Sequence, residues 1–386
     1  MSQTVNRSEL EARYISGEAP WPVAPIDWET AARDVLEQRA FDYIAGGAAD
    51  GTTVQTNHEA LRRWRLRPRV LTGNLEHDLS VEVLGTRSPL PFFIAPVGVL
   101  RLAHEDREHA VARAAAARGI PMIVSTCAST SMEDIAEALG DTPRWYQLYW
   151  VSDREVTESF VRRAEAAGYG AIVVTVDTLG LGWRDRDIVN NYLPFLEGDG
   201  IAQFTSDPVF RTRLSEPPEA NVEAAGLMMV SIFPNLGLAW RDLAWLRELT
   251  SLPLLLKGVL RADDARLAIE AGIDGIIVSN HGGRQVDGAQ APIDGLPEVR
   301  KALGEGVPVL MDSGIRRASD IFKALALGAD AVLLGRPYVY GLAVGGEAGV
   351  AQVLRSLEGE LDVTASLLGI RNVGELDRSF VTAAGP

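Results

Sequence analysis

Residues 262–281, ADDARLAIEAGIDGIIVSNH, decide the fold of this chain. An Ala- and Leu-containing helical segment stops at Gly272, and an apolar run begins three residues later at Gly275. Glycine tolerates the left-handed conformation found just past a helix end, so Gly272 marks a helix stop. The run from Gly275 to Val278 is short and apolar, which indicates a strand of a buried parallel sheet. The stretch therefore predicts one helix followed by one strand.

The same helix-then-strand unit occurs at three other places in the sequence. Gly119, Gly168 and Gly328 each end a helical segment, and an apolar run follows each of them at the same spacing: Met122–Val124, Ala171–Val174 and Ala331–Leu334. Four more apolar runs fit the alternation with helices: Phe92–Ala95, Trp145–Tyr149, Leu254–Lys257 and Val307–Met311.

Eight strands alternating with helices predict an α/β protein with a single (β/α)₈ TIM barrel. An open, doubly wound sheet is the alternative, because periodicity alone does not show whether the sheet closes. Helix starts are marked as well: Ser152 with Glu155 three residues later has the spacing of a capping box.

Two parts of the chain lie outside the eight units. Residues 1–90 are predicted as an N-terminal helical extension that packs on the barrel, and residues 91–386 as the barrel itself. Residues 185–238 are predicted as a long loop inserted after the fourth strand, rich in Pro, Gly and Asn. A long connection at this end of a barrel is typically a lid or a binding loop, and a disordered loop is the alternative.

Composition limits the possible partners and compartments. The 386 residues carry a formal net charge of −15 at pH 7, which disfavours nucleic acid and anionic membrane surfaces as partners. No stretch approaches the roughly 18 apolar residues of a spanning helix, and residues 1–10 lack the apolar segment of a signal peptide. We therefore expect a cytoplasmic protein. Cys127 is the single cysteine, which excludes an intrachain disulfide and a cysteine-rich zinc site, and no metal site is expected.

Polar or small residues follow almost every predicted strand, where the active sites of such barrels collect. Asp177 and His281 each lie nine residues after a stop glycine, so their side chains are expected to face each other across the barrel mouth. The residues at strand ends are Ser125, Thr126, Gln147, Tyr149, Thr175, Asp177, Lys257, Ser279, Asn280, His281, Asp312, Ser313, Gly314, Gly335 and Arg336.

The loops after strands seven and eight predict a phosphate site. They read Asp312-Ser313-Gly314-Ile315-Arg316 and Gly335-Arg336. Glycines let backbone N–H groups approach an anion, arginines grip it with two hydrogen bonds, and this is the usual phosphate position in such barrels.

With these residues in place, the chain resembles the FMN-dependent 2-hydroxy acid oxidising family, of the glycolate oxidase and lactate oxidase type. The resemblance runs from about Trp28 to Phe380 and is carried by five motifs: Ser279-Asn280-His281-Gly282-Gly283-Arg284-Gln285, Arg67-Pro68-Arg69-Val70-Leu71, Gln147-Leu148-Tyr149, Lys257-Gly258-Val259 and Gly335-Arg336-Pro337. It implies FMN as cofactor, a small 2-hydroxy acid and O₂ as substrates, and a homo-oligomer, either tetramer or octamer.

The resemblance also implies a role for each residue of the substrate site. His281 would take a proton during oxidation of the substrate Cα, and Asp177 would stabilise the imidazolium. Arg284 and Arg184 would bind the substrate carboxylate with help from Tyr43, and Tyr149 would contact the substrate hydroxyl. Whether the Cα delivers a carbanion or a hydride stays open.

A second set of residues would hold FMN. Lys257 would lie near the flavin ring and stabilise its reduced, anionic form. The remaining assignments, also implied by the resemblance, are Pro96, Val97, Gly98, Ser125, Gln147, Thr175 and Ser279 for the ring, Asp312 for the ribityl hydroxyls, and Ser313, Gly314, Arg316, Gly335 and Arg336 for the phosphate.

Within the family, the lactate 2-monooxygenase branch is the most similar. The likeness is carried by Ala45-Gly46-Gly47, Gly182-Trp183-Arg184, Asp207-Pro208-Val209-Phe210, Asp312-Ser313-Gly314-Ile315-Arg316 and Gly98. Such an enzyme would decarboxylate its keto acid with peroxide before releasing either. An oxidase that releases keto acid and peroxide, or a quinone-linked dehydrogenase, would use the same substrate site. A barrel isomerase with a phosphate-bearing ligand would keep the two arginines but would not need His281, Arg284 and Arg184.

Overall fold

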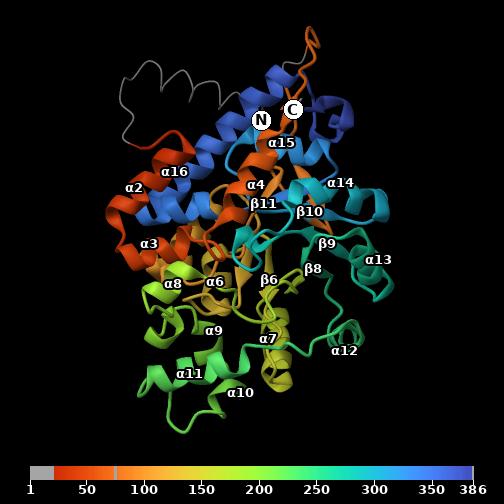
Figure 1. Ribbon diagram of the computed structural model, residues 1–386. Helices are drawn as coiled ribbons and strands as arrows, with labels where there is room; N and C mark the ends of the chain where they lie inside the picture. Colours follow the sequence, from red (N-terminus) through yellow and green to blue (C-terminus); the bar gives the residue numbers. More distant parts are fainter. Residues whose placement is uncertain (1–20, 74–75, 385–386) are drawn as a thin grey trace.

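The computed structural model describes residues 21–73 and 76–384 (Figure 1). Within these residues, eight parallel strands close into one barrel, in the order β10-β11-β4-β5-β6-β7-β8-β9. Successive strands pair with each other, and β11 pairs with β4 to complete the ring. The closed ring confirms the predicted (β/α)₈ barrel and excludes the doubly wound sheet. Residues 1–10, predicted as a polar N-terminus, lie outside the described part.

Every predicted apolar run forms a barrel strand. The largest differences are at β8, which continues two residues past Lys257, and at β10, which begins at Val309 instead of Val307. The strands are β4 (Phe92–Ile94), β5 (Met122–Ser125), β6 (Arg144–Leu148), β7 (Ile172–Thr175), β8 (Leu254–Val259), β9 (Gly275–Val278), β10 (Val309–Met311) and β11 (Ala331–Leu334).

A helix follows each strand and packs on the outside of the barrel. The last one is long and bends where Gly345 and Gly346 leave the helical conformation. The outer helices are α5 (Arg107–Ala116), α6 (Met132–Leu139), α7 (Arg154–Ala166), α12 (Leu243–Leu249), α13 (Ala262–Glu270), α14 (Pro292–Leu303), α15 (Ala318–Ala326) and α16 (Arg336–Leu368).

The start of α7 differs from the prediction. Asp153, not Ser152, is the N-cap, and its carboxylate accepts hydrogen bonds from the backbone N–H groups of Glu155 and Val156. Ser152 Oγ instead donates to the Ile232 carbonyl. Both serine and aspartate are good caps, so the one-residue shift was not visible in the sequence.

The residues before the barrel contain strands that the sequence analysis missed. Helices α2 (Pro25–Val35), α3 (Gln38–Ala45) and α4 (Thr52–Arg62) lead into β1 (Trp64–Leu66), which pairs with β12 (Val381–Ala383) near the C-terminus. A hairpin follows, made of β2 (Val81–Val83) and β3 (Thr86–Ser88). All four strands are three residues long and lie outside the repeating helix-then-strand unit, so neither a periodicity nor the repeat marks them.

The hairpin closes one end of the barrel. Its Val83 belongs to the buried cluster that fills the barrel interior, with Phe93, Trp145 and Leu333 among the other members. Trp145, near the start of β6, donates from Nε1 to Thr86 Oγ1 at 2.9 Å. The open mouth is therefore at the opposite end, where the strands finish.

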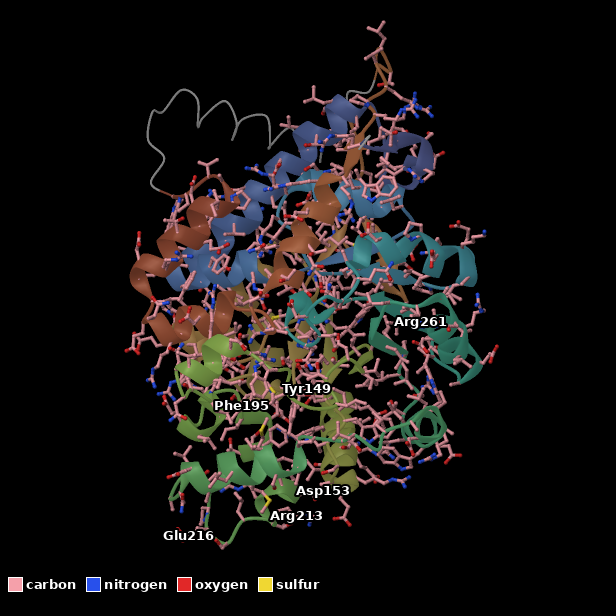
Figure 2. The ribbon with its side chains drawn as sticks, in the orientation of Figure 1. Tyr149, Asp153, Phe195, Arg213, Glu216 and Arg261 are labelled. Atoms are coloured by element: carbon pink, nitrogen blue, oxygen red, sulfur yellow. The ribbon has the colours of Figure 1, made fainter. Side chains whose placement is uncertain are left out.

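The insertion after β7 is folded into short helices. They are α8 (Asp185–Val189), η2 (Pro194–Glu197), α9 (Ala202–Thr205), α10 (Pro208–Arg211) and α11 (Val222–Ile232). In Figure 1, α9, α10 and α11 lie beside α7 at the lower end of the molecule. Figure 2 labels Asp153 and Arg213, an ion pair that joins α7 to the insertion with 2.8 Å between Oδ2 and Nε.

Asp207 is the buried anchor of this insertion. Its carboxylate is fully buried and accepts from Ser159 Oγ at 2.6 Å and Arg163 Nη1 at 3.1 Å, both on α7. It also caps α10 by accepting from the backbone N–H groups of Val209 and Phe210. Gln203 adds a second tie, because its side chain bonds the backbone at both Thr130 and Met132.

No helix in the described part of the chain combines the length and apolar character needed to cross a bilayer.

We expect Asp207→Ala to lower the free energy of unfolding by about 3 kcal/mol, because it removes the buried acceptor of Ser159 and Arg163 and a helix cap, while Arg163 keeps its ion pair with Glu133. The measurement is equilibrium urea denaturation. The control is Glu219→Ala, which removes an exposed carboxylate paired with Arg211 in the same insertion and is expected to leave the midpoint unchanged. Equal midpoints for Asp207→Ala and the native protein would contradict this account of the anchor.

Candidate active site

A cavity opens at the carboxyl ends of the barrel strands. It encloses about 1160 Å³, including the solvent in its mouth. Most of the predicted site residues line it: Tyr43, Pro96, Val97, Gly98, Ser125, Tyr149, Arg184, Lys257, His281, Arg284, Asp312, Ser313, Gly314, Arg316, Gly335 and Arg336. The other four predicted residues, Gln147, Thr175, Asp177 and Ser279, are not part of the lining and support it through hydrogen bonds.

The support on one side is a row of hydrogen bonds across three strands. Ser125 Oγ donates to Gln147 Oε1 at 3.1 Å, and Gln147 Nε2 donates to Thr175 Oγ1 at 2.9 Å. All three side chains are buried, and parallel pairing places Ser125 opposite Gln147. The row fixes the orientation of the Gln147 amide beneath the cavity floor.

The support on the other side is a buried cation. Lys257 Nζ donates to Ser279 Oγ at 2.9 Å and lies 2.9 Å from Asp312 Oδ2. Burial acts to lower the pKa of Lys257, but the negative charges of Asp312 and Asp177 outweigh it and raise the pKa. Lys257 is therefore a fixed positive charge at neutral pH, on the floor of the cavity.

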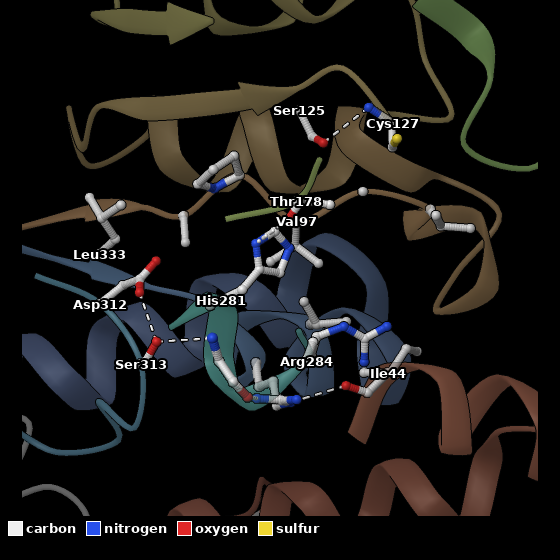
Figure 3. Close-up of a pocket in the computed structure, with 18 of the residues that line it drawn as sticks. Ile44, Val97, Ser125, Cys127, Thr178, His281, Arg284, Asp312, Ser313 and Leu333 are labelled. Carbon is white, nitrogen blue, oxygen red and sulfur yellow. Dashed lines mark hydrogen bonds between the residues drawn. The ribbon is translucent and has the colours of Figure 1, made fainter. Parts of the chain in front are cut away.

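His281 and Asp177 form the central pair. The distance from His281 Nδ1 to Asp177 Oδ1 is 2.9 Å, so the two residues expected to face each other across the mouth are in hydrogen-bond contact. Thr178 Oγ1 lies 3.1 Å from the same ring nitrogen, and Tyr149 Oη lies 3.3 Å from Nε2. Figure 3 shows the imidazole projecting into the middle of the cavity, close to Thr178.

The electrostatics of this pair favour a neutral imidazole beside an ionised carboxylate. Burial, with the nearby charges of Lys257 and Arg184, lowers the pKa of His281, although Asp177 opposes the change. Burial acts to raise the pKa of Asp177, but the interaction with His281 and the charge of Lys257 bring it below the usual value. His281 Nε2 can therefore accept a proton, and Asp177 is placed to stabilise the cation that forms.

Backbone geometry holds the pair in place. His281 has a φ of 59°, and its backbone N–H donates to Ser279 Oγ at 3.0 Å. Gly258 lies at the bulge in β8 with a φ of 108°, and a Cβ there would lie 2.6 Å from the Asp177 side chain. Only glycine leaves room for the Asp177 carboxylate at this point.

Two arginines and a tyrosine form one end of the cavity. The guanidinium carbons of Arg184 and Arg284 lie 5.9 and 5.0 Å from the centre of the Tyr43 ring. Arg284 Nη1 donates to the carbonyls of Tyr43 and Gly46, at 2.6 and 2.9 Å. Burial, together with the charge of Arg184, lowers the pKa of Arg284 to about 9, so it is still a cation at pH 7. This end suits a carboxylate.

The other end holds the predicted phosphate loops. Arg316 and Arg336 both line it, and Gly314 has a φ of 87°, where a Cβ would lie 3.0 Å from the carbonyl oxygen of Asn57 in α4. Arg336, predicted to bind the phosphate, also donates to the carbonyls of Ile44, Gly46 and Gly282, at 3.0, 2.7 and 2.9 Å. Figure 3 shows the bond to Ile44. Arg336 therefore also fixes the end of α3.

Gly98 is explained by packing. A Cβ at this position would lie 2.6 Å from the Cys127 carbonyl oxygen and 2.8 Å from the Cys127 Cβ. The added methyl would thus contact the chain after β5 and not the open cavity. The requirement for glycine follows from this contact and does not by itself indicate the fate of a product.

The residues present fit FMN. Among the described residues that line the cavity, five side chains are cationic (Arg184, Lys257, Arg284, Arg316 and Arg336) and one is acidic (Asp312). In a chain with a net charge of −15, this concentration of positive charge indicates anionic ligands. Asp312 and Ser313 lie between the charged ends and offer hydrogen-bond partners for hydroxyl groups. Gly335 has no side chain to occupy this part of the cavity, and a Cβ built there would lie 3.8 Å from the Ala95 side chain.

Several residues of the cavity were missed by the sequence analysis. Thr178 directly follows Asp177, so its place at a strand end was the available signal. Cys127 follows β5 in the same way. The others come from the insertion and from bulky apolar positions with no local signal: Ile44, Val99, Leu181, Phe195, Phe233 and Leu333. Figure 2 shows Tyr149 and Phe195 at the junction of barrel and insertion.

Comparisons with known proteins agree with this site. The family described as FMN-dependent dehydrogenase matches residues 32–383. The chain is 40% identical over 366 residues to L-lactate oxidase of Lysinibacillus sphaericus (strain C3-41), covering 95% of this chain and 94% of that protein. It is 44% identical over 360 residues to 2-hydroxyacid oxidase 1 of Homo sapiens, covering 92% and 95%.

A solved structure shows the same architecture. The crystal structure of mandelate oxidase with (S)-4-hydroxymandelic acid superposes with a TM-score of 0.85 at 39% identity, covering 95% of this chain and all of that one. These comparisons confirm the family predicted from the sequence motifs but do not single out the monooxygenase branch. The chain belongs to the FMN-dependent dehydrogenase family.

Proposed function

We propose that this protein oxidises 2-hydroxy acids to 2-keto acids, with FMN as its cofactor and O₂ as the electron acceptor, and releases hydrogen peroxide. The observation that carries the proposal is the His281–Asp177 pair, 2.9 Å apart, in a cavity that also holds Arg184 and Arg284. A base beside two carboxylate-binding cations is the arrangement that deprotonation of a 2-hydroxy acid requires. The named relatives, L-lactate oxidase and 2-hydroxyacid oxidase 1, support the same reaction class.

Binding of the substrate begins with its carboxylate. Arg184 and Arg284, both next to the Tyr43 ring, are the cations that would bind it, because a guanidinium can offer parallel N–H donors to a carboxylate. The positive charges there repel each other while the site is empty, so a bound carboxylate relieves that repulsion. With the carboxylate held, the substrate Cα and hydroxyl face Tyr149 and His281.

The proton is handled by His281. Its Nε2 lies 3.3 Å from Tyr149 Oη and faces the cavity, while Nδ1 is occupied by Asp177 and Thr178. His281 would accept the proton at Nε2, and the resulting positive charge would lie beside the Asp177 carboxylate. The tyrosine hydroxyl orients the substrate hydroxyl toward the same nitrogen.

FMN, when bound, accepts the two electrons that leave the substrate Cα. Lys257 would place a positive charge near the flavin ring, which becomes negative when it is reduced. Asp312 and Ser313 would bind hydroxyl groups of the FMN ribityl chain. Arg316 and Arg336, with the backbone of Gly314 and Gly335, would bind the phosphate. A positive charge about 4 Å from a negative one contributes on the order of 4 kcal/mol at an effective dielectric constant near 20.

Decarboxylation of the keto acid before release, as in a lactate 2-monooxygenase, is the competing outcome. It uses the same residues and differs only in how long the keto acid and peroxide share the cavity. The packing of Gly98 against Cys127 removes one argument for it, so release of peroxide is the simpler proposal.

We expect Arg316→Ala to weaken FMN binding by about 100-fold, since it removes a charge-assisted pair with the phosphate. The dissociation constant is measured by quenching of FMN fluorescence on titration with apoprotein. Arg317→Ala is the control, because Arg317 is the sequence neighbour but is half exposed and pairs with Glu360. Similar affinities for the two variants would place the phosphate elsewhere.

We expect kcat/KM to rise with pH through the lowered pKa of His281 and to level off above it, because only the neutral imidazole accepts a proton. Burial sets that pKa below 6.5, and Asp177 raises it. Asp177→Asn should therefore move the inflection to lower pH while reducing the rate.

His281→Ala should lower the rate of flavin reduction, followed as anaerobic bleaching of the flavin absorbance, by about 10²- to 10⁴-fold. A loss below tenfold would assign the base to another residue.

Product analysis tests the reaction outcome. With lactate and O₂, we expect one hydrogen peroxide and one pyruvate for each lactate consumed, measured by a coupled peroxidase assay run with catalase-free enzyme and by chromatography of the acids. Acetate in place of pyruvate, with no free peroxide, would establish the monooxygenase outcome. Absence of flavin bleaching by every 2-hydroxy acid tried would overturn the proposed function itself.

A further inference from the structure

Asp187 places a third charge beside the two arginines of the substrate end. It lies on α8, in the insertion, and its Oδ2 is 3.7 Å from Arg184 Nη1. Both side chains are largely buried, with 16% of Asp187 and 11% of Arg184 exposed. The positive charge of Arg284 also attracts the Asp187 carboxylate and acts to lower its pKa. The carboxylate of the chain itself therefore neutralises one of the two positive charges that face a substrate.

Two other acidic groups at the cavity are already paired with basic side chains. Asp177 pairs with His281, and Asp312 pairs with Lys257. Asp187 has no part in binding FMN or in moving the proton. Asp187 is not among the residues that line the cavity, and its charge acts on the arginine pair and on Tyr43. The two arginines and Asp187 together carry a net charge of one.

The position of Asp187 is set by the fold and not by Arg184 alone. Tyr192 N–H donates to the Asp187 carbonyl at 3.0 Å, and Asn190 Nδ2 donates to Asp42 Oδ2 of α3 at 3.1 Å. At the start of α8, the Ala49 N–H donates to the Trp183 carbonyl at 2.7 Å. The bond to Asp42 joins the end of α8 to α3, the helix that also carries Tyr43, and the other two fix the two ends of α8.

The rest of the substrate end is apolar. Leu181, Phe195 and Phe233 line the cavity there, and Phe233 packs edge-on against Tyr149 with 5.0 Å between ring centres. The cations at the opposite end, Arg316 and Arg336, are the ones assigned to phosphate. A second carboxylate on the substrate would meet apolar walls and the negative charge of Asp187, with no cation left to pair with it.

We propose that Asp187 determines the charge of the substrate: the site accepts 2-hydroxy acids that carry one carboxylate and an apolar substituent, and Asp187 rejects those that carry a second carboxylate. The inference rests on the proposed function, because it concerns the same site. Specificity of this kind comes from a repulsive contact with the wrong ligand as much as from an attractive one with the right ligand. Burial raises the pKa of Asp187, and the charges of Arg284 and Arg184 limit that rise.

The test is the charge preference of the holoenzyme with and without this carboxylate. In Asp187→Asn, kcat/KM for 2-hydroxysuccinate, divided by kcat/KM for lactate, should rise at least tenfold over the native ratio, because like-charge contacts strongly suppress binding. Asp185→Asn is the matched control: it removes the same charge from the same helix, but Asp185 is exposed and bonds Trp183 Nε1. Its ratio should stay within about twofold, since exposed charges are screened.

An unchanged ratio in Asp187→Asn would overturn the inference, and so would an equal fall in both kcat/KM values, which would mean that Asp187 only positions Arg184. Asp187→Ser, with thermal melting of each variant, separates these outcomes from a folding defect. Binding of non-reacting anions, malonate against acetate, followed by the shift of the flavin absorbance, tests the same charge preference independently of turnover. If no 2-hydroxy acid bleaches the native holoenzyme, the proposed function fails, while a tenfold gain of malonate over acetate in Asp187→Asn still supports the role of Asp187.

Discussion

Closure of the eight parallel strands fixes which side chains meet in the cavity. The hydrogen-bond register places Ser125 beside Gln147 and Thr175 beside Lys257, so polar side chains from neighbouring strands reach the same height. A parallel barrel has all its strands ending at one rim, and residues far apart in the chain therefore share one small space. His281 and Asp177 are 104 residues apart and form a hydrogen bond only because β7 and β9 both finish there.

Burying the positive charges of the cavity costs free energy, and hydrogen bonds to backbone carbonyls reduce that cost. Arg284 and Arg336 are buried near each other, and both donate to the Gly46 carbonyl, directly after α3. Carbonyls at the end of a helix lack partners within the helix and carry partial negative charge, so they suit a buried guanidinium. The same two arginines thus hold Tyr43 in place and keep donors available for anions.

Unusual backbone conformations cluster around the cavity. Val99, His281 and Ser313 line it with φ angles of 60°, 59° and 74°, although none is glycine. Such conformations cost of order 1–3 kcal/mol each and persist where the surroundings enforce them. For His281 the enforcing contacts are the bond from its N–H to Ser279 and the pairing of its ring with Asp177. The strain orients the imidazole toward the cavity instead of along the strand.

The sequence by itself determined the eight strands, the helices between them and the residues at the strand ends, because stop glycines and apolar runs recur with a fixed spacing. That spacing also predicted that Asp177 and His281 face each other, and the motifs identified the family, but closure of the sheet and the contact between these two residues were seen only in the tertiary structure. The tertiary structure decided what local patterns do not encode. Strands β1 and β12 lie outside the repeating helix-then-strand unit and form only because residues 64–66 and 381–383, far apart in the chain, pair with each other. Arg336 was recognised as an anion ligand, but its bonds to the carbonyls of α3 depend on how the N-terminal helices pack. Asp187 and Phe195 reach the substrate end because the insertion folds back over the barrel mouth, an arrangement set by distant contacts such as that of Asp207 with Arg163.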